Sequence, residues 1–246
     1  MANDKPTESN PRRFPTTSWT MVSAAGCQST GSAGALSDLC VAYWLPVYAF
    51  IRRKGYSPEE SEDLCQSFFT RVIDNGTVGE ARRERGKFRS FLLASVTHFV
   101  ANEWDRSQAQ KRGGGCTTLS FDFGAGEDSY HREPYHELTP EALYERQWAM
   151  ALLDRVLGRQ REEHARRGKA AQFDLLKMFL AGDQDGDSTH KLTAKLDMSY
   201  AAIRTAVHRL RRRYAELLRE EIAATVADPE EVDGELRFLL AALERQ

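Results

Sequence analysis

The chain has 246 residues, of which 41% are hydrophobic and 28% charged, with a formal net charge of −2. This composition excludes a wholly disordered chain, because it supplies enough apolar material for a packed core. The sequence has no unbroken apolar run near the about 18 residues of a membrane span, no secretory leader pattern and no CxxC pair among its four cysteines. We therefore expect a protein of the reducing cytoplasm that does not insert into a membrane.

Charge is distributed unevenly along the chain. Residues 81–112 contain eight Lys or Arg against three acids, and residues 188–220 contain the same numbers. Residues 114–147 contain seven acids and two bases, and residues 220–246 contain eight acids and two bases. Two basic blocks predict two surfaces that face a polyanion, and a solvated helix surface is the alternative for each block.

Helical patterning dominates the chain, and alternating strand patterns of useful length are almost absent. Three helix starts combine a capping residue with a following proline: Ser57-Pro58, Thr139-Pro140 and Asp228-Pro229. Ser57 and Glu60 also have the spacing of a capping box. We predict an all-α fold.

Composition also predicts how the chain is divided. Glycines and acidic residues between 113 and 138 indicate a flexible acidic linker between two helical domains. The expected order is a mobile tail at 1–18, a helical domain at 19–112, the linker at 113–138, a second helical domain at 139–219 and an acidic helical extension at 220–246.

The helix expected after Ser57 carries a polar strip beside a broad apolar face. Asp63, Gln66 and Thr70 lie together beyond the edge of that face. A polar strip bordering apolar residues suits a partner helix, and a simple solvated face fits the pattern equally well.

The first basic block interleaves cations with aromatic residues, namely Phe88, Phe91, Phe99 and Trp104. Cations for the backbone and rings for the bases are what a surface for single-stranded nucleic acid needs. The alternative is that the aromatic residues belong mainly to the core. The nucleic-acid contacts predicted in this block are Arg89, Arg106, Lys111 and Arg112.

The second basic block has the layout of a helix-turn-helix. A short helix over Lys191–Leu196 is followed by a turn at Asp197–Ser199 and a longer helix from Tyr200. At 100° per residue the apolar side chains of the longer helix occupy one face, opposite a cationic face. The DNA contacts predicted on this helix are Arg204, Thr205, His208, Arg209, Arg211 and Arg212. A solvated arginine-rich helix is the alternative.

Patterns typical of enzymes are not recognisable. Gly86-Lys87 lacks the upstream glycine spacing and the following Ser or Thr of a phosphate-binding loop, and the six histidines are scattered. We predict a protein that is not an enzyme, with no catalytic residue, no cofactor and no metal site.

Three segments, in this order, resemble bacterial RNA polymerase sigma factors of the extracytoplasmic-function (ECF) type, in a divergent subgroup. Asp63-Leu64-Cys65-Gln66-Ser67-Phe68-Phe69 is similar to the D-x-x-Q-x-x-F helix that binds core polymerase. The segment from Lys87 to His98 is similar to the promoter-melting segment, with Phe91 where Trp is usual and His98 where Asn is usual. The segment from Leu192 to Arg213 is similar to the helix-turn-helix that reads the upstream promoter element.

The resemblance implies a factor that binds core RNA polymerase and promoter DNA to start transcription, and an anti-sigma protein as a further partner. It places Asp63, Gln66 and Phe69 at the polymerase, and Arg204, Thr205, His208 and Arg209 at the upstream element. The alternative is a non-sigma helix-turn-helix regulator with an N-terminal helical interaction domain. An enzyme or adaptor that uses the acidic segments is a third hypothesis, without a supporting motif.

Overall fold

The computed structural model describes residues 19–26, 32–82, 84, 86–109, 121–132, 137–182 and 192–245. These ranges contain helices and no strand, so the prediction of an all-α fold is confirmed for the described residues. The helices are α1 (Trp19–Gly26), α2 (Ser32–Arg53), α3 (Pro58–Asp74), η1 (Thr77–Glu80), α4 (Phe88–Ala109), α5 (Phe123–Arg132), α6 (Pro140–Arg166), α7 (Ala170–Leu176), η3 (Lys177–Ala181), α9 (Tyr200–Thr225), η4 (Pro229–Glu231) and α10 (Val232–Glu244). Residues 192–196 are also helical.

The three predicted helix starts lie where the sequence placed them. Ser57 and Glu60 form a reciprocal capping box, in which the Ser57 hydroxyl accepts from the Glu60 amide at 3.2 Å and the Glu60 carboxylate accepts from the Ser57 amide at 2.9 Å. The Thr139 hydroxyl caps α6 by accepting from the Ala142 amide. Asp228 caps the short η4, which leads directly into α10. Local capping chemistry therefore determines where these elements begin.

A large apolar cluster, the main core, joins segments that are far apart in the sequence. Its members come from α1 to α4, from α6, and from the C-terminal part of the chain; fully buried examples are Tyr43, Tyr48, Phe68, Tyr144, Leu217 and Leu239. The predicted first domain, the helix α6 and the acidic extension thus share one core. The apolar clusters do not follow the predicted boundaries at 112/139 and 219/220.

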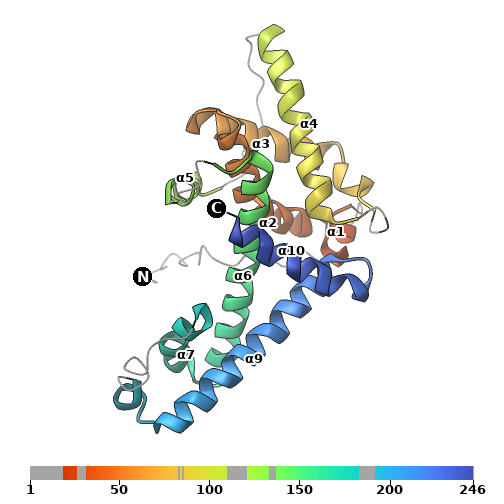
Figure 1. The fold of residues 1–246 in the computed structure, drawn as a ribbon. Coiled ribbons are helices and arrows are strands. Elements are labelled where there is room, and N and C mark those ends of the chain that lie inside the picture. The colour runs from red at the N-terminus through yellow and green to blue at the C-terminus, as the bar shows by residue number, and fades with distance from the viewer. Residues whose placement is uncertain are drawn as a thin grey trace, which may run out of the picture.

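A smaller apolar cluster, the satellite cluster, lies apart from the main core. Its buried members are Phe173, Leu176, Phe179, Leu192, Ile203, Val207 and Leu210. They come from α7, η3, residues 192–196 and the first half of α9. Figure 1 shows α6 and α9 running side by side between the group of helices that contains α7 and the group that contains α2.

The predicted linker contains a helix that is packed against the rest of the protein. The rings of Phe121 and Phe123 lie 5.8 and 5.7 Å from the ring of Trp44 in α2. The Glu127 carboxylate in α5 accepts hydrogen bonds from Tyr48 and Arg52, the latter at 2.8 Å. The expectation of a flexible linker is therefore corrected over residues 121–132, because aromatic packing and a half-buried ion pair fix this segment to α2.

Helix α2 provides the centre of the main core. Its segment Gly34–Arg53 is long and apolar enough to cross a membrane by length and composition alone, although polar residues interrupt its apolar runs. In the structure 61% of its most apolar window is buried inside the protein, and the core helices of soluble proteins pass the same test. Its apolar character is accounted for by the helices that cover it.

We expect Gly126→Ala in α5 to lower the free energy of unfolding by about 1–3 kcal/mol, because overpacking forces a neighbour to move. A Cβ atom at Gly126 would lie 2.7 Å from Cζ3 and 2.9 Å from Cη2 of the buried Trp44. Gly124→Ala is the matched control, since its Cβ would meet only the Asp122 carboxylate, at 3.7 Å. Chemical denaturation of both variants checks this, and equal stabilities would contradict the close packing of α5 on α2.

Candidate nucleic-acid interface

A tight connection sets the direction in which α9 leaves residues 192–196. The Met198 amide donates to the Thr193 carbonyl at 3.2 Å, and Asp197 has a φ of 51°. Aspartate is one of the few residues that adopt this left-handed conformation readily. The Ser199 hydroxyl then caps α9 by accepting from the Ala202 amide at 3.2 Å. The helix start predicted at Ser199 is confirmed.

The first half of α9 presents four polar side chains to solvent. Arg204, Thr205, His208 and Arg209 are all exposed, and we call them the α9 strip. Their helix is held from behind by the satellite cluster through Ile203, Val207 and Leu210. Within the described part of the chain, neither arginine of the strip forms an ion pair, so both charges are available to an external anion.

The arginines that follow the strip have partners inside the protein. Arg211 donates from Nε to the Phe179 carbonyl at 3.0 Å and from Nη2 to the Gly182 carbonyl at 2.9 Å. Its guanidinium thereby holds the end of η3 against α9. Arg212 pairs with Glu216 at 3.0 Å, but its side chain is 76% exposed. Of these two predicted DNA contacts, Arg212 remains accessible and Arg211 supports the satellite cluster.

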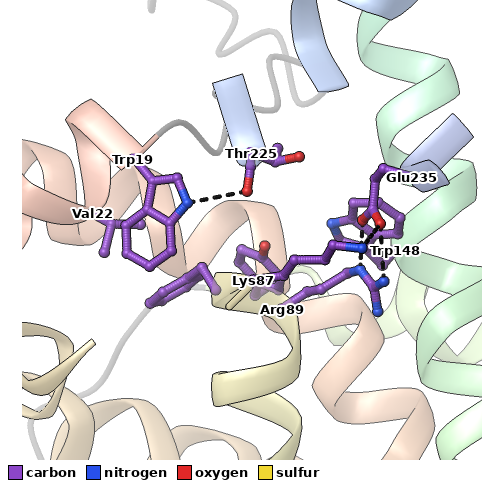
Figure 2. A pocket seen from close by; sticks show the side chains of 9 residues that line it. Trp19, Val22, Lys87, Arg89, Trp148, Thr225 and Glu235 are labelled. Atoms are coloured by element: carbon purple, nitrogen blue, oxygen red, sulfur yellow. Dashed lines mark hydrogen bonds and ion pairs between the residues drawn. The ribbon is translucent and has the colours of Figure 1, made fainter. Parts of the chain in front are cut away.

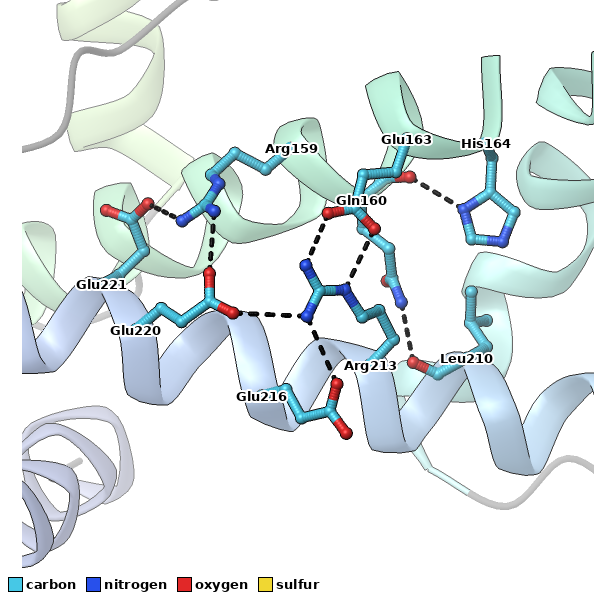
Figure 3. Close-up of polar contacts among 9 residues, drawn as sticks. All are labelled: Arg159, Gln160, Glu163, His164, Leu210, Arg213, Glu216, Glu220 and Glu221. Carbon is cyan, nitrogen blue, oxygen red and sulfur yellow. Dashed lines mark hydrogen bonds and ion pairs between the residues drawn. The ribbon is translucent and has the colours of Figure 1, made fainter. Parts of the chain in front are cut away.

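Arg213 links α9 to α6 directly behind the strip. Its guanidinium lies 2.7 Å from the Glu163 carboxylate and 3.3 Å from each of Glu216 and Glu220 (Figure 3). The hydrogen bond from Arg213 lowers the pKa of Glu163, and the same bond raises the pKa of Arg213. Both groups are therefore charged at neutral pH.

Further contacts from Gln160, Arg159 and Arg155 continue this link along α6. The Gln160 amide donates to the Leu210 carbonyl at 2.7 Å, and Arg159 lies 2.6 Å from Glu221 and 2.9 Å from Glu220 (Figure 3). Arg155 also faces the buried Glu221 carboxylate, at 3.5 Å. The position of the α9 strip relative to α6 is thus fixed by several charged and polar contacts.

The predicted polymerase-binding residues of α3 differ in exposure. Asp63 is exposed and Gln66 is half-buried. Phe69 is only 2% exposed, and its ring lies 5.3 Å from the ring of Phe68 and 5.5 Å from the ring of Phe121. The structure therefore leaves Asp63 and Gln66 accessible to a partner and places Phe69 in the main core.

Arg89, predicted to contact nucleic acid, is occupied by the C-terminal helix. Its side chain is 6% exposed, and its Nε lies 2.9 Å from the carboxylate of Glu235 in α10 (Figure 2). The guanidinium carbon lies 3.8 Å from the ring centre of Phe238 and 4.9 Å from that of Trp148. Arg89 therefore cannot contact a nucleic acid in this conformation.

Glu235 also pairs with Lys87, next to the start of α4. Burial alone would raise the pKa of the Glu235 carboxyl, but the hydrogen bonds and charges of Arg89 and Lys87 outweigh burial and hold this pKa below its usual range. The carboxylate is therefore ionised at neutral pH although the residue is fully buried.

The remainder of the first basic block divides between core and surface. Phe88 and Phe99 are buried in the main core, whereas Trp104 is 57% exposed. The side chain of Arg106, as well as Lys111 and Arg112, lies outside the described residues. Of the aromatic residues in the block, Trp104 offers the most open ring.

Sequence reasoning missed Glu235, although the pattern of α10 contains a signal. Val232, Leu239 and Ala242 form the buried stripe of this helix, and Glu235 lies on the same stripe. A carboxylate within an apolar stripe indicates a buried cationic partner. The sequence does not identify that partner, because Arg89 is 146 residues away from Glu235.

The described residues contain no group of three or more His, Cys, Asp or Glu side chains that could hold a metal ion. The small pocket shown in Figure 2 lies where α1, α4, α6 and α10 meet, and Trp19, Arg89, Trp148 and Glu235 are among its lining residues. Its charged groups are already paired with one another, so the α9 strip is the more open cationic surface.

We expect Arg211→Ala to lower the free energy of unfolding by about 1–3 kcal/mol, because two carbonyls lose a charged donor. Arg209→Ala, two residues earlier in the exposed strip, is the control and should leave stability unchanged within about 0.5 kcal/mol. Thermal and urea unfolding of both variants measures this. If the two variants are equally stable, Arg211 does not support η3.

No family model, no curated protein and no solved structure matches this chain. The fold class therefore rests on the helices of the structure. The choice among possible partners rests on the α9 strip, on the accessible residues of α3 and α4, and on the three sequence motifs.

Proposed function

We propose that the protein is a sigma factor of the ECF type, which binds core RNA polymerase in the cytoplasm and directs promoter-specific transcription initiation. The observation that carries the proposal is the α9 strip. Its four exposed polar side chains, two of them arginines, lie near the start of a helix that follows a short helix and a tight turn. A short helix, a tight turn and a longer helix are the components that a helix-turn-helix requires, and the second helix of that motif reads the major groove with its N-terminal residues.

The chemistry of the strip suits a DNA duplex. The major groove is about 12 Å wide and admits one α-helix. Arginine can donate two hydrogen bonds to a guanine edge or to a phosphate, and Thr205 and His208 supply shorter polar groups between the two arginines. Since the satellite cluster and α6 fix the helix from behind, the strip can enter the groove without rearranging its support.

The first half of the chain supports a second contact with nucleic acid and one with polymerase. Trp104 lies in the C-terminal part of α4, is 57% exposed and meets the ring of Tyr56 edge-on at 6.4 Å. An exposed ring of this kind can stack on an unpaired base. On α3, Asp63 and Gln66 form the accessible part of the polymerase motif.

The alternative, a non-sigma regulator with the same DNA-binding helix, is favoured by one observation. Phe69, the last residue of the proposed polymerase motif, is buried in the main core. A plain regulator needs no docking strip on α3, so dependence on core polymerase distinguishes the two functions.

Run-off transcription with purified core polymerase on fragmented genomic DNA tests the proposal. The full chain should direct specific start sites. Asp63→Arg should reduce both start-site use and association with the polymerase at least about tenfold, because it reverses the charge and enlarges the side chain at the docking surface. Asp38→Arg, a charge reversal at an exposed position of α2, is the control. Failure of the folded wild-type chain to direct any specific start would favour the regulator.

We expect Arg204→Ala to cost about 1–3 kcal/mol at one or two base positions, and Arg212→Ala to weaken binding evenly across sequences. Arg204 lies within the strip, whereas Arg212 lies two turns further on and forms an ion pair with Glu216. Transcription from a library of upstream-element variants measures both effects. A uniform loss with Arg204→Ala, without a change in base preference, would show that Arg204 contacts phosphate.

A further inference from the structure

The C-terminal helix α10 lies against the beginning of α4 and neutralises the cations there. The Glu235 carboxylate forms ion pairs with both Lys87 and Arg89, and the Glu145 carboxylate of α6 lies 3.8 Å from the same Arg89 guanidinium. The ring of Phe238 covers the guanidinium face at 3.8 Å. Two cations of the first basic block are thus held by an acid from the other end of the chain.

This contact differs from an ordinary surface ion pair. Glu235 is fully buried, whereas the Lys87 side chain remains 29% exposed and so marks the solvent side of the pair. A buried ion pair is a weak source of stability, because desolvation of both charges offsets most of their attraction. Apolar residues in place of all three charged groups, Lys87, Arg89 and Glu235, would hold α10 in place at least as well, so stability alone does not account for this charged cluster.

A carboxylate does provide something that an apolar side chain does not: an anion in contact with Arg89 and Lys87. A nucleic-acid phosphate has the same charge and accepts the same bidentate hydrogen bonds from arginine. Glu235 therefore occupies the position that a phosphate would take if α4 contacted a nucleic-acid backbone. The two anions cannot share the site.

The other end of the chain meets the same junction. The Trp19 indole donates to the Thr225 carbonyl at the end of α9, at 3.1 Å (Figure 2), and its ring meets that of Phe88 edge-on at 6.4 Å. Helix α1 and the end of α9 thus hold the residues immediately before η4 and α10. The Asp228-Pro229 segment lies between this end of α9 and the helix α10.

We propose that α10 is an autoinhibitory helix, in which Glu235 acts as an internal substitute for a nucleic-acid phosphate on Lys87 and Arg89. In the free chain the beginning of α4 is closed to nucleic acid. It opens when a single strand takes over the two cations and α10 moves away. This inference depends on the proposed function in one respect: under that function, the single strand comes from a melted promoter.

The test compares Glu235→Gln with Asp233→Asn in the full chain. Both changes remove one negative charge from α10, but Asp233 is exposed and, among the described residues, pairs only with the exposed Arg219. Binding of a fluorescent oligo(dT) of about 20 nucleotides is measured by anisotropy at low salt. We expect Glu235→Gln to bind at least about fivefold more tightly than Asp233→Asn, and Lys87→Gln in the Glu235→Gln background to abolish the gain.

Equal affinity of Glu235→Gln and Asp233→Asn would overturn the proposal. Hydrogen exchange on the wild-type chain gives a second measurement that does not depend on folding of the variant. Saturating oligo(dT) should accelerate exchange of amides 232–244, and unchanged or slower exchange there would also overturn it. If the oligo(dT) results hold but the chain directs no start with core polymerase, the proposed function fails and the autoinhibitory contact stands.

Discussion

Burial of the Glu221 carboxylate between two arginines of α6 is the constraint on which the arrangement of the two apolar cores depends. Arg155 and Arg159 approach this carboxylate from successive turns of α6. A buried charge that loses its partner costs about 3–5 kcal/mol, so α6 and α9 cannot slide past one another freely. Because the main core encloses the first half of α6 and the second half of α9, this contact also fixes the satellite cluster.

Arginines of similar sequence context perform different tasks in this arrangement. Arg204 and Arg209 face solvent, Arg211 holds the end of η3, and Arg213 binds three acids beside α6. Charge composition alone does not separate these roles, since the helical wheel gives direction but not distance to a partner. The cationic surface open to an external anion is therefore smaller than the basic block from which it derives.

Features that depend on neighbouring residues were predictable, whereas those that depend on distant ones were not. The all-α class and the starts at Ser57, Thr139 and Ser199 follow from capping and periodicity within one or two turns. Helix α5 was missed because its glycines and acids resemble a linker, and only Trp44 and Arg52 of α2 explain its packing. The family resemblance placed Phe69 at the polymerase, but its side chain is buried, and the ring of Phe121 lies 5.5 Å from its ring.

The contact between Trp19 and Thr225 has a consequence for the order of folding during synthesis. These residues are 206 positions apart, so at about 5–20 residues per second the ribosome needs roughly 10–40 s to produce the second after the first. Helix α2 packs most extensively against α6, so it lacks that cover until residues 140–166 have been made. A long apolar helix therefore emerges early and is covered by α6 only later, which makes the nascent chain a candidate for binding by a chaperone.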